Sequence, residues 1–467
     1  MPTTGRLARI VRRMLTVATV AAVVIGHPGA GAGAHGRTTL YVSPRGSDSA
    51  DGTARRPLRT PQIAVDRLGP LGGTVRLLGG RYAGQRIVIE QRAHIAVRAA
   101  AGAVPVLDGA GLAPPDGQSG MIEIRDSSDV TVDGLTVTGY RTRRLAAVPI
   151  GILVTGSGRS IRLTGNHVHH LGNDNGTLGS FEMNAHGVAV FGTDAERPLT
   201  GVTVSGNELD HLVLGASETL VLNGNVDGWS VVGNDIHDNN NIGIDAIGFE
   251  GTIGGAARFT DVNRARNGLI AHNRVSRIIS EGNPAYWDDG SWCDCADGIY
   301  VDGGAAITIT GNRVDDSDIG IEVASEWRQG RTNGITVTGN TVTRSRYTGL
   351  AVGGYDQDRG EAYDISVTNN LVRGDNLGIL LQYYVHDTTI RRNTVVSTDR
   401  DEPVLLQRVA PAGGAARNAR LVLNDNDYRG RVPAGQESYL WNDVEQRGLR
   451  AYRAASGQDT RSTYHRQ

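Results

Sequence analysis

The chain has 467 residues, a formal net charge of −2 and 39% hydrophobic residues. This length exceeds one ordinary globular core, unless the fold grows by repetition. The near-neutral charge excludes the basic surface that nucleic-acid binding requires. All 47 positive charges are arginines, so lysine cannot serve as a general base or as a Schiff-base nucleophile.

The first 34 residues are typical of a signal peptide. Arginines at positions 6, 9, 12 and 13 precede an apolar run over residues 14–26, and the small residues 30–34 supply an A-x-A cleavage site. The run is too short to span a bilayer, and no later segment is long and apolar enough. We therefore expect a secreted, extracellular protein with no membrane association after cleavage, exported by the general or the twin-arginine route.

Thr60 and Pro61 predict the start of a helix. Threonine is a good N-cap and proline suits the first helical position, so we expect a helix over about residues 61–69.

Short strands recur after this helix in blocks of alternating apolar residues that end in asparagine, as in residues 307–312, Ile-Thr-Ile-Thr-Gly-Asn. The period of two predicts a strand, and Gly-Asn supplies the left-handed backbone that turns a corner. We expect the aligned asparagines to stack as an internal ladder. They are Asn166, Asn207, Asn234, Asn273, Asn312, Asn340, Asn370 and Asn393.

A second type of strand begins with glycine and alternates with the first. These glycines are Gly151, Gly187, Gly243, Gly298, Gly320, Gly349 and Gly378. From Gly298 onward the spacings are 22, 29 and 29 residues. Such periods predict stacked coils with parallel strands and one continuous apolar core. A β-propeller needs a period of about 40–50 residues and a leucine-rich repeat needs a leucine consensus, so both are excluded.

Both ends of the chain resemble secreted bacterial right-handed parallel β-helix proteins of the pectin lyase-like superfamily. The first segment is Tyr41-Val42-Ser43-Pro44-Arg45-Gly46-Ser47-Asp48. The last, from Trp441-Asn442-Asp443 to Gly457-Gln458-Asp459, is similar to the short helix and tail that close many such chains. With the repeats, the resemblance covers nearly the whole chain after the leader. It does not select a reaction, because the superfamily includes lyases, hydrolases, epimerases and non-catalytic adhesins.

We therefore predict an all-β, right-handed parallel β-helix with a short capping helix at each end. The expected organisation is a signal peptide (1–34), an opening segment with the first capping helix (35–80), the β-helix (81–430) and a C-terminal capping segment (431–467). The caps would cover strand edges that otherwise invite aggregation. We expect a monomer.

Acidic residues gather on three successive coils when the strands are aligned on their first glycine. The second and fourth residues after the glycine should face solvent. Asp245, Tyr300 and Glu322 share the second position, and Asp302 has the fourth. Asp302 and Glu322 would then lie on adjacent coils, about 8 Å apart between Cα atoms. Carboxylates this close repel, so one pKa should rise and give a proton donor beside a base or nucleophile.

The surroundings of these acids suggest a sugar-binding groove. Aromatic residues make up only 5% of the chain, yet several lie near the acids, and sugar rings stack on aromatic faces. His186 is a further candidate because it precedes Gly187 as Asp297 precedes Gly298. The substrate-binding candidates are Tyr300, Asp297, Glu326, Trp327, Trp292, Trp287, Tyr355 and His186.

The two cysteines, Cys293 and Cys295, lie in the insertion over residues 281–296. In an exported protein they could form a small-ring disulfide or remain free thiols. A zinc site is disfavoured, because no second cysteine pair or histidine spacing completes it.

The favoured function is glycoside hydrolysis by an Asp/Glu pair on adjacent coils. Residues 298–302 with 321–323 resemble the local arrangement of β-helical β-xylosidases. That resemblance implies Asp302 as nucleophile or base and Glu322 as acid, with Asp245 as a third catalytic candidate and no required cofactor. Separation of the two carboxyl groups would decide between retention and inversion.

Two alternatives stay open. A polysaccharide lyase or epimerase acting on uronic acids could use Ca²⁺ held by Asp245, Asp302 and Glu322. Without lysine its base would be Arg328, His186 or Tyr300. A non-catalytic carbohydrate-binding or surface β-helix would show no convergence of acids on one face.

Overall fold

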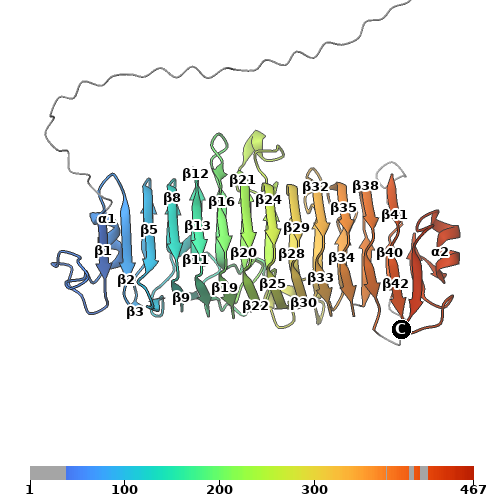
Figure 1. Ribbon diagram of the computed structural model, residues 1–467, viewed down its shortest axis with the longest axis horizontal. Coiled ribbons are helices and arrows are strands. Elements are labelled where there is room, and N and C mark those ends of the chain that lie inside the picture. The colour runs from blue at the N-terminus through green and yellow to red at the C-terminus, as the bar shows by residue number, and fades with distance from the viewer. Residues whose placement is uncertain (1–37, 375, 399–403, 411–418) are drawn as a thin grey trace, which may run out of the picture. The chain divides into compact units, whose positions relative to one another are not determined.

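The computed structural model describes residues 38–374, 376–398, 404–410 and 419–467, so the predicted signal peptide lies outside the described residues. These residues form one compact unit, an elongated solenoid whose coils stack along a single axis (Figure 1). In this described part, no helix is long and apolar enough to cross a membrane.

Each coil contributes one strand to each of three parallel sheets, which confirms the predicted right-handed parallel β-helix. We number the sheets in the order in which a coil passes through them. Sheet 1 contains β1 (Thr38–Val42), β2 (Gly73–Leu77), β5 (Ala93–Ala99), β8 (Ser128–Asp133), β12 (Gly158–Arg159), β13 (Ile161–Thr164), β17 (Leu199–Thr200), β18 (Thr203–Ser205), β21 (Val226–Val232), β24 (Arg266–Ala271), β29 (Ala305–Thr310), β32 (Arg331–Thr338), β35 (Glu361–Thr368), β38 (Val385–Arg391) and β41 (Leu421–Asn424).

Sheets 2 and 3 have the same parallel stacking. Sheet 2 contains β3 (Gly80–Ala83), β6 (Pro105–Asp108), β9 (Thr136–Thr138), β14 (His167–His169), β19 (Glu208–Asp210), β22 (Asp235–Asn239), β25 (Arg274–Ile278), β30 (Arg313–Ser317), β33 (Thr341–Thr343), β36 (Leu371–Arg373), β39 (Thr394–Val396), β42 (Asp427–Gly430) and β45 (Thr463–Arg466). Sheet 3 contains β4 (Ile87–Glu90), β7 (Gly117–Arg125), β11 (Ala147–Gly156), β16 (His186–Gly192), β20 (Leu220–Gly224), β23 (Ile244–Ile247), β28 (Asp297–Asp302), β31 (Ile319–Ala324), β34 (Thr348–Val352), β37 (Leu377–Leu381), β40 (Val404–Arg408), β43 (Ser438–Trp441) and the antiparallel β44 (Val444–Arg447).

Short elements complete the described chain. They are the pair β10 (Arg141–Thr142) and β15 (Gly172–Asn173), the antiparallel pair β26 (Trp287–Asp288) and β27 (Ser291–Trp292), and 3₁₀ helices at Gly255–Ala257 and Pro284–Tyr286.

The asparagine ladder is present as predicted. Asn273 Nδ2 donates to Asn312 Oδ1 at 3.0 Å, and Asn312 Nδ2 donates in turn to Asn340 Oδ1 at 3.0 Å. The ladder continues beyond the last predicted member to Asn426, whose Nδ2 donates to Asp459 Oδ1 at 3.0 Å. Each amide also bonds a backbone carbonyl, so the ladder satisfies buried polar groups at every coil corner.

Two different requirements place the repeating glycines. Gly311, in the Gly-Asn corner, has φ +65°, which favours glycine as predicted. Gly298 does not have positive φ; a Cβ there would lie 2.4 Å from Val314 Cγ1. The glycine that begins each such strand is therefore needed because the coil passes closely over the core where sheet 2 turns into sheet 3.

Helices close both ends of the solenoid. Helix α1 (Pro61–Arg67) begins at the predicted proline and ends two residues early. The predicted cap by Thr60 is wrong in detail, because its hydroxyl donates to Asp48 Oδ2 at 2.7 Å and makes no cap bond. Helix α2 (Leu449–Ser456) ends at Gly457, which has φ +68°. The β-helix was predicted to begin at residue 81, but the parallel stacking of sheet 1 already includes β1 and β2, which precede that residue.

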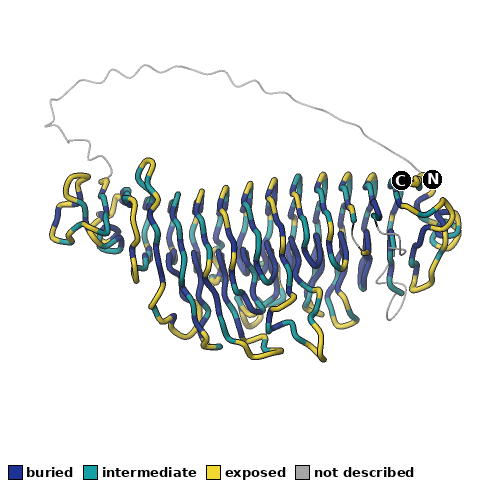
Figure 2. Tube along the Cα trace, turned by 90° about the horizontal axis from the view of Figure 1, so that it is seen from below, coloured by how far each residue is buried: buried dark blue, intermediate teal, exposed yellow. Residues whose placement is uncertain are grey.

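Exposed loop segments extend from one long side of the middle coils (Figure 2). These segments include residues 248–265 and 279–296, which connect sheet 3 to sheet 1 and sheet 2 to sheet 3 in neighbouring coils.

Candidate active site

The outward face of sheet 3 carries the acids in the register predicted from the glycines. Asp245 on β23 pairs with Tyr300 on β28, and Tyr300 pairs with Glu322 on β31. Asp302 pairs with Ala324, so Asp302 and Glu322 lie diagonally on adjacent coils. The glycine alignment is therefore confirmed for this face.

The expectation that these side chains face open solvent is wrong. Asp245, Asp302 and Glu322 are 2%, 4% and 5% exposed. Loops pack over the outward face and enclose the acids. The loop after β31 brings Glu326, whose backbone N–H donates to Asp302 Oδ1 at 2.6 Å.

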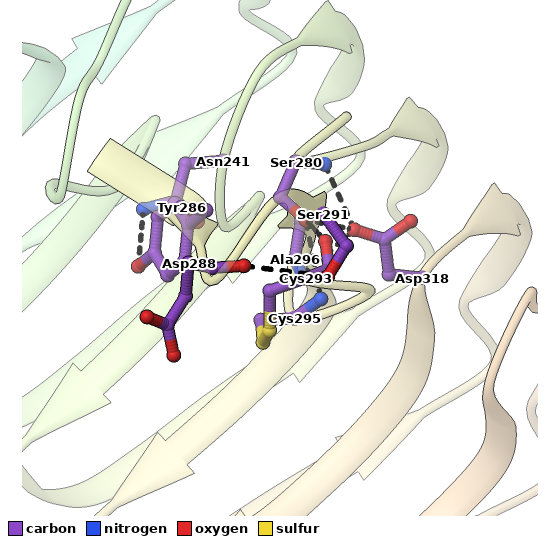
Figure 3. The surroundings of a disulfide bond; sticks show 9 residues. All are labelled: Asn241, Ser280, Tyr286, Asp288, Ser291, Cys293, Cys295, Ala296 and Asp318. Carbon is purple, nitrogen blue, oxygen red and sulfur yellow. Dashed lines mark hydrogen bonds between the residues drawn. A yellow bond between two sulfur atoms is a disulfide. The ribbon is translucent and has the colours of Figure 1, made fainter. Parts of the chain in front are cut away.

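A neighbouring pair of loops is tied together and to the solenoid. Gly179 N–H donates to the Pro284 carbonyl at 2.8 Å, which joins the loop before β16 to the insertion 281–296. Figure 3 shows how the ends of this insertion are held: Asp318 accepts hydrogen bonds from the backbone N–H groups of Ser280 and Ala296, at 2.8 and 3.0 Å. A disulfide joins Cys293 and Cys295 within the same insertion.

Asp297 joins the acids because the chain turns at the start of β28. The side-chain positions of Gly298 and Ile299 both point to the core, so Asp297 lies on the outward side. After burial itself, the neighbouring carboxyl group of Glu322 is the largest cause that raises the pKa of Asp297. One oxygen of this side chain, Asp297 Oδ1, has no hydrogen-bond partner among the described residues.

Burial in this setting raises the pKa values of the acids. It raises the pKa of Glu322 to about 8, with a smaller contribution from the charge of Glu326. The pKa values of Asp245, Asp297 and Asp302 also lie well above the ordinary range, chiefly through burial and then through neighbouring carboxylates. At neutral pH the cluster therefore holds protons that isolated acids would have lost.

Two further acids were missed by the sequence analysis. Glu218 has a pKa raised to about 8 by burial and then by Glu250, whose own pKa burial also raises. Glu218 precedes β20, which has no initial glycine to align on, although it corresponds to His186 on the preceding coil. Glu250 reaches the site from the loop after β23, where Asn223 Nδ2 donates to it at 2.6 Å. Loop positions of this kind have no repeat register.

The proposed substrate-binding residues divide into buried and rim positions. Tyr300 is buried, and its hydroxyl donates to Glu326 Oε1 at 3.4 Å. His186 is also buried, 3.4 Å from Glu218, and burial lowers its pKa to about 4. Trp327 and Tyr355 are 37% and 54% exposed on neighbouring loops.

The other two tryptophans form a pair of their own. Trp287 and Trp292 face each other on the β26–β27 hairpin with ring centroids 4.7 Å apart. The structure places them on the insertion beside the site, and their described ring contact is with each other and not with the acids.

Two arginines lie at the rim, beside the exposed aromatic rings. Arg359 Nη1 is 3.7 Å from Glu326 Oε2 and its guanidinium stacks on Tyr355 at 4.1 Å. Arg258 stacks on Trp327 at 4.3 Å. Arg328 is mostly exposed and pairs with Asp358 at 3.6 Å, away from the acids.

A hollow of about 520 Å³ lies elsewhere, on sheet 1, lined by arginines that include Arg76, Arg98 and Arg162 and by the single acid Asp129. It offers no pair of acids, so the enclosed face of sheet 3 is the better candidate active site.

Comparison with known proteins agrees with this architecture. Residues 264–426 match the family described as right handed beta helix region. The chain is 36% identical over 436 residues to the uncharacterized protein YwoF of Bacillus subtilis (strain 168), covering 91% of this chain and 87% of YwoF. The fold and these matches define a right-handed parallel β-helix protein. Within this class, the chain belongs to the same family as YwoF.

Two solved structures of the GH136 lacto-N-biosidase from Eubacterium ramulus have a similar fold. The selenomethionine derivative matches with a TM-score of 0.58 at 15% identity, over 84% of this chain and 67% of that one. The native protein matches with a TM-score of 0.51 at 14% identity, over 92% and 68%. At this identity the likeness extends to the fold alone.

Proposed function

We propose that the protein is a secreted glycoside hydrolase that cleaves an extracellular polysaccharide or oligosaccharide. The observation that carries this proposal is the enclosed group of carboxyl side chains on one sheet face, with raised pKa values. A purely structural solenoid has no need to bury such groups, since each costs free energy to desolvate. The fold itself can hold a glycosidase site, as the lacto-N-biosidase shows for its own chain.

Glu322 is the proposed general acid. With a pKa of about 8 it carries a proton at neutral pH and can donate it to the leaving-group oxygen. Gln382 Nε2 donates to Glu322 Oε1 at 3.2 Å and fixes the orientation of the carboxyl group.

Asp302 is the proposed base or nucleophile. The backbone N–H of Glu326 donates to it and favours its ionised form, whereas burial and the charge of Glu326 raise the pKa of Asp302 well above its ordinary value. Asp245, which lies beside Tyr300 on the same sheet face and whose pKa burial also raises, is the third catalytic candidate.

Trp327 and Tyr355 would supply stacking surfaces for sugar rings at the rim, with Glu326 and Asp297 as hydrogen-bonding groups nearer the acids. Both aromatic rings are partly exposed, and because a guanidinium already covers one face of each, a sugar ring would stack on the opposite face.

One observation favours a Ca²⁺-assisted lyase or epimerase as a second candidate. Asp245 Oδ1 and Asp297 Oδ1 are buried and have no partner among the described residues, and Ca²⁺ prefers such carboxylate oxygens. Asp245, Asp302 and Glu322 would then hold the ion. Of the proposed bases, His186 is neutral at pH 7, whereas burial raises the pKa of Tyr300 well above its ordinary value.

The test is a screen of the purified protein against neutral and uronic-acid polysaccharides, with Ca²⁺ or with chelator. Reducing ends and the absorbance of unsaturated products are measured in parallel. New reducing ends without unsaturated product, lowered about 10²–10⁴-fold in both Glu322→Gln and Asp302→Asn, are expected. Full activity in these variants would refute the assignment, and chelator-sensitive unsaturated product would establish the lyase instead.

A further inference from the structure

Five of the twelve histidines lie together on sheet 2, on a different sheet from the candidate active site. They come from the adjacent strands β14, β19 and β22 and the corners that follow them. We call this group, with Glu208 and Asp210, the histidine ridge. Its histidines are His167, His169, His170, His211 and His237.

The repeat sets the spacing of two of these side chains. His170 and His211 occupy equivalent corners after β14 and β19, each with φ +51°. Their rings stack with centroids 4.8 Å apart and planes inclined by 8°. The corner does not itself require histidine, because Asp238 and Arg277 occupy the next two equivalent corners with φ +55° and +54°.

Asp210 lies at the centre of the ridge and is buried. Its Oδ2 is 2.5 Å from His167 Nε2, and its Oδ1 is hydrogen-bonded to His211 Nδ1. Ligand atoms of His170, Asp210 and His211 all lie within 4.8 Å of one another, and so do those of His167, Glu208 and Asp210. Asp210 is thus common to two overlapping sets of three ligands.

We propose that the histidine ridge binds a divalent transition-metal ion, Zn²⁺ above all, with Asp210 as the central ligand and His170 and His211 as imidazole ligands. Imidazole nitrogen and carboxylate oxygen are the ligands that zinc prefers, at about 2.0–2.2 Å. Tetrahedral coordination brings ligand atoms to about 3.3 Å from each other. In the structure the ligand atoms lie within 4.8 Å of one another, and the side chains of His170 and His211 are exposed, so these two would rotate towards a bound ion.

The bound ion would connect two successive coils. His170 follows β14, whereas Asp210 and His211 belong to the next coil, so the ion would add a link between two coils whose strands β14 and β19 already pair through their backbones. His167, which already touches Asp210, is the residue placed to take the fourth coordination position. This proposal does not depend on the proposed hydrolase activity.

The test is calorimetric titration of the tag-free, chelator-treated protein with Zn²⁺ alone, and with Co²⁺ to read the ligand geometry from its visible spectrum. Asp210→Asn is nearly isosteric. His170→Asn and His211→Asn place at each corner a residue that tolerates positive φ. The matched control is His272→Asn, because His272 is also an exposed corner histidine, with φ +55°, but belongs to neither ligand set.

We expect Zn²⁺ to bind the unaltered protein and the His272→Asn variant with the same Kd. The Kd should rise at least about tenfold in Asp210→Asn, His170→Asn and His211→Asn, as for lost metal ligands. Thermal melts with Zn²⁺ should show an increase in Tm in the first two proteins only. Equal Zn²⁺ affinity in Asp210→Asn and the unaltered protein, or an equal loss in His272→Asn, would overturn the proposal.

Discussion

Replacing Glu322 by glutamine should stabilise the protein at alkaline pH, although it removes the proposed general acid. Glu322 is buried, and its pKa is raised to about 8. Glutamine has nearly the same shape, so its carbonyl can still accept from Gln382 and its amide can donate to Asp297. The substitution therefore removes a buried charge while the packing and hydrogen bonds of the site remain.

The sign of the effect follows from linkage. A carboxyl group whose pKa is higher in the folded than in the unfolded protein stabilises the fold fully below the unfolded value, here 4.5, and this contribution is lost as pH rises towards about 8. Each pKa unit is worth about 1.4 kcal/mol, so the upper limit is about 5 kcal/mol. Neighbouring acids share protons with Glu322, so we expect a gain of about 1–3 kcal/mol at about pH 8.5 and none at about pH 5.

The assay is urea unfolding followed by tryptophan fluorescence across this pH range. Glu196→Gln, at an exposed acid in the loop after β16, is the matched control and should leave the free energy of unfolding unchanged at every pH. The reasoning fails if Glu322→Gln is no more stable than the unaltered protein at high pH, or if the control gains as much.

Three further predictions concern the ladder, the rim and the insertion. Asn312→Ala should lower the free energy of unfolding by about 3–5 kcal/mol, because it removes the acceptor for two hydrogen bonds and the donor for two more. The control, Thr308→Ala on the strand before this corner, should cost under about 1 kcal/mol. Equal midpoints of urea unfolding in the two variants would contradict this prediction. Trp327→Ala should raise KM about five- to tenfold at unchanged kcat, as measured by steady-state kinetics on the substrate found by the screen, since about 1–1.5 kcal/mol of stacking is lost. Replacing both Cys293 and Cys295 by serine should lower the free energy of unfolding by at most about 2 kcal/mol, as measured in thermal melts, because the ring that the disulfide closes is short. Global unfolding of this variant would contradict the prediction and show that the insertion depends on the disulfide.

The fold could be predicted from the sequence because every coil of a solenoid repeats the same local arrangement of strands and corners. Each coil must turn corners and bury an apolar stripe, so Gly-Asn corners and alternating strands recur at a readable spacing. Asn312 in the ladder and Gly298 at the strand start were both identified in this way, and Asn312 accepts the ladder bond from Asn273 as expected. The same register placed Asp245, Tyr300 and Glu322 in one column.

The repeat could not predict what lies over that column. Glu218 and Glu250 lie outside the aligned positions, and the loops that bury Asp302 follow no period. Enclosure matters chemically, because solvent-exposed acids on an open strand would keep ordinary pKa values, whereas burial raises that of Glu322 to about 8.

The sequence by itself therefore determined the architecture, the strand register and which sheet carries the acids, since these follow from interactions between one coil and the next. Only the tertiary structure decided which of these outward side chains are enclosed, which loop residues join them and how the ridge around Asp210 is assembled. Those features depend on contacts between segments far apart in the chain, such as Gly179 with Pro284, and a repeating local pattern carries no information about such contacts.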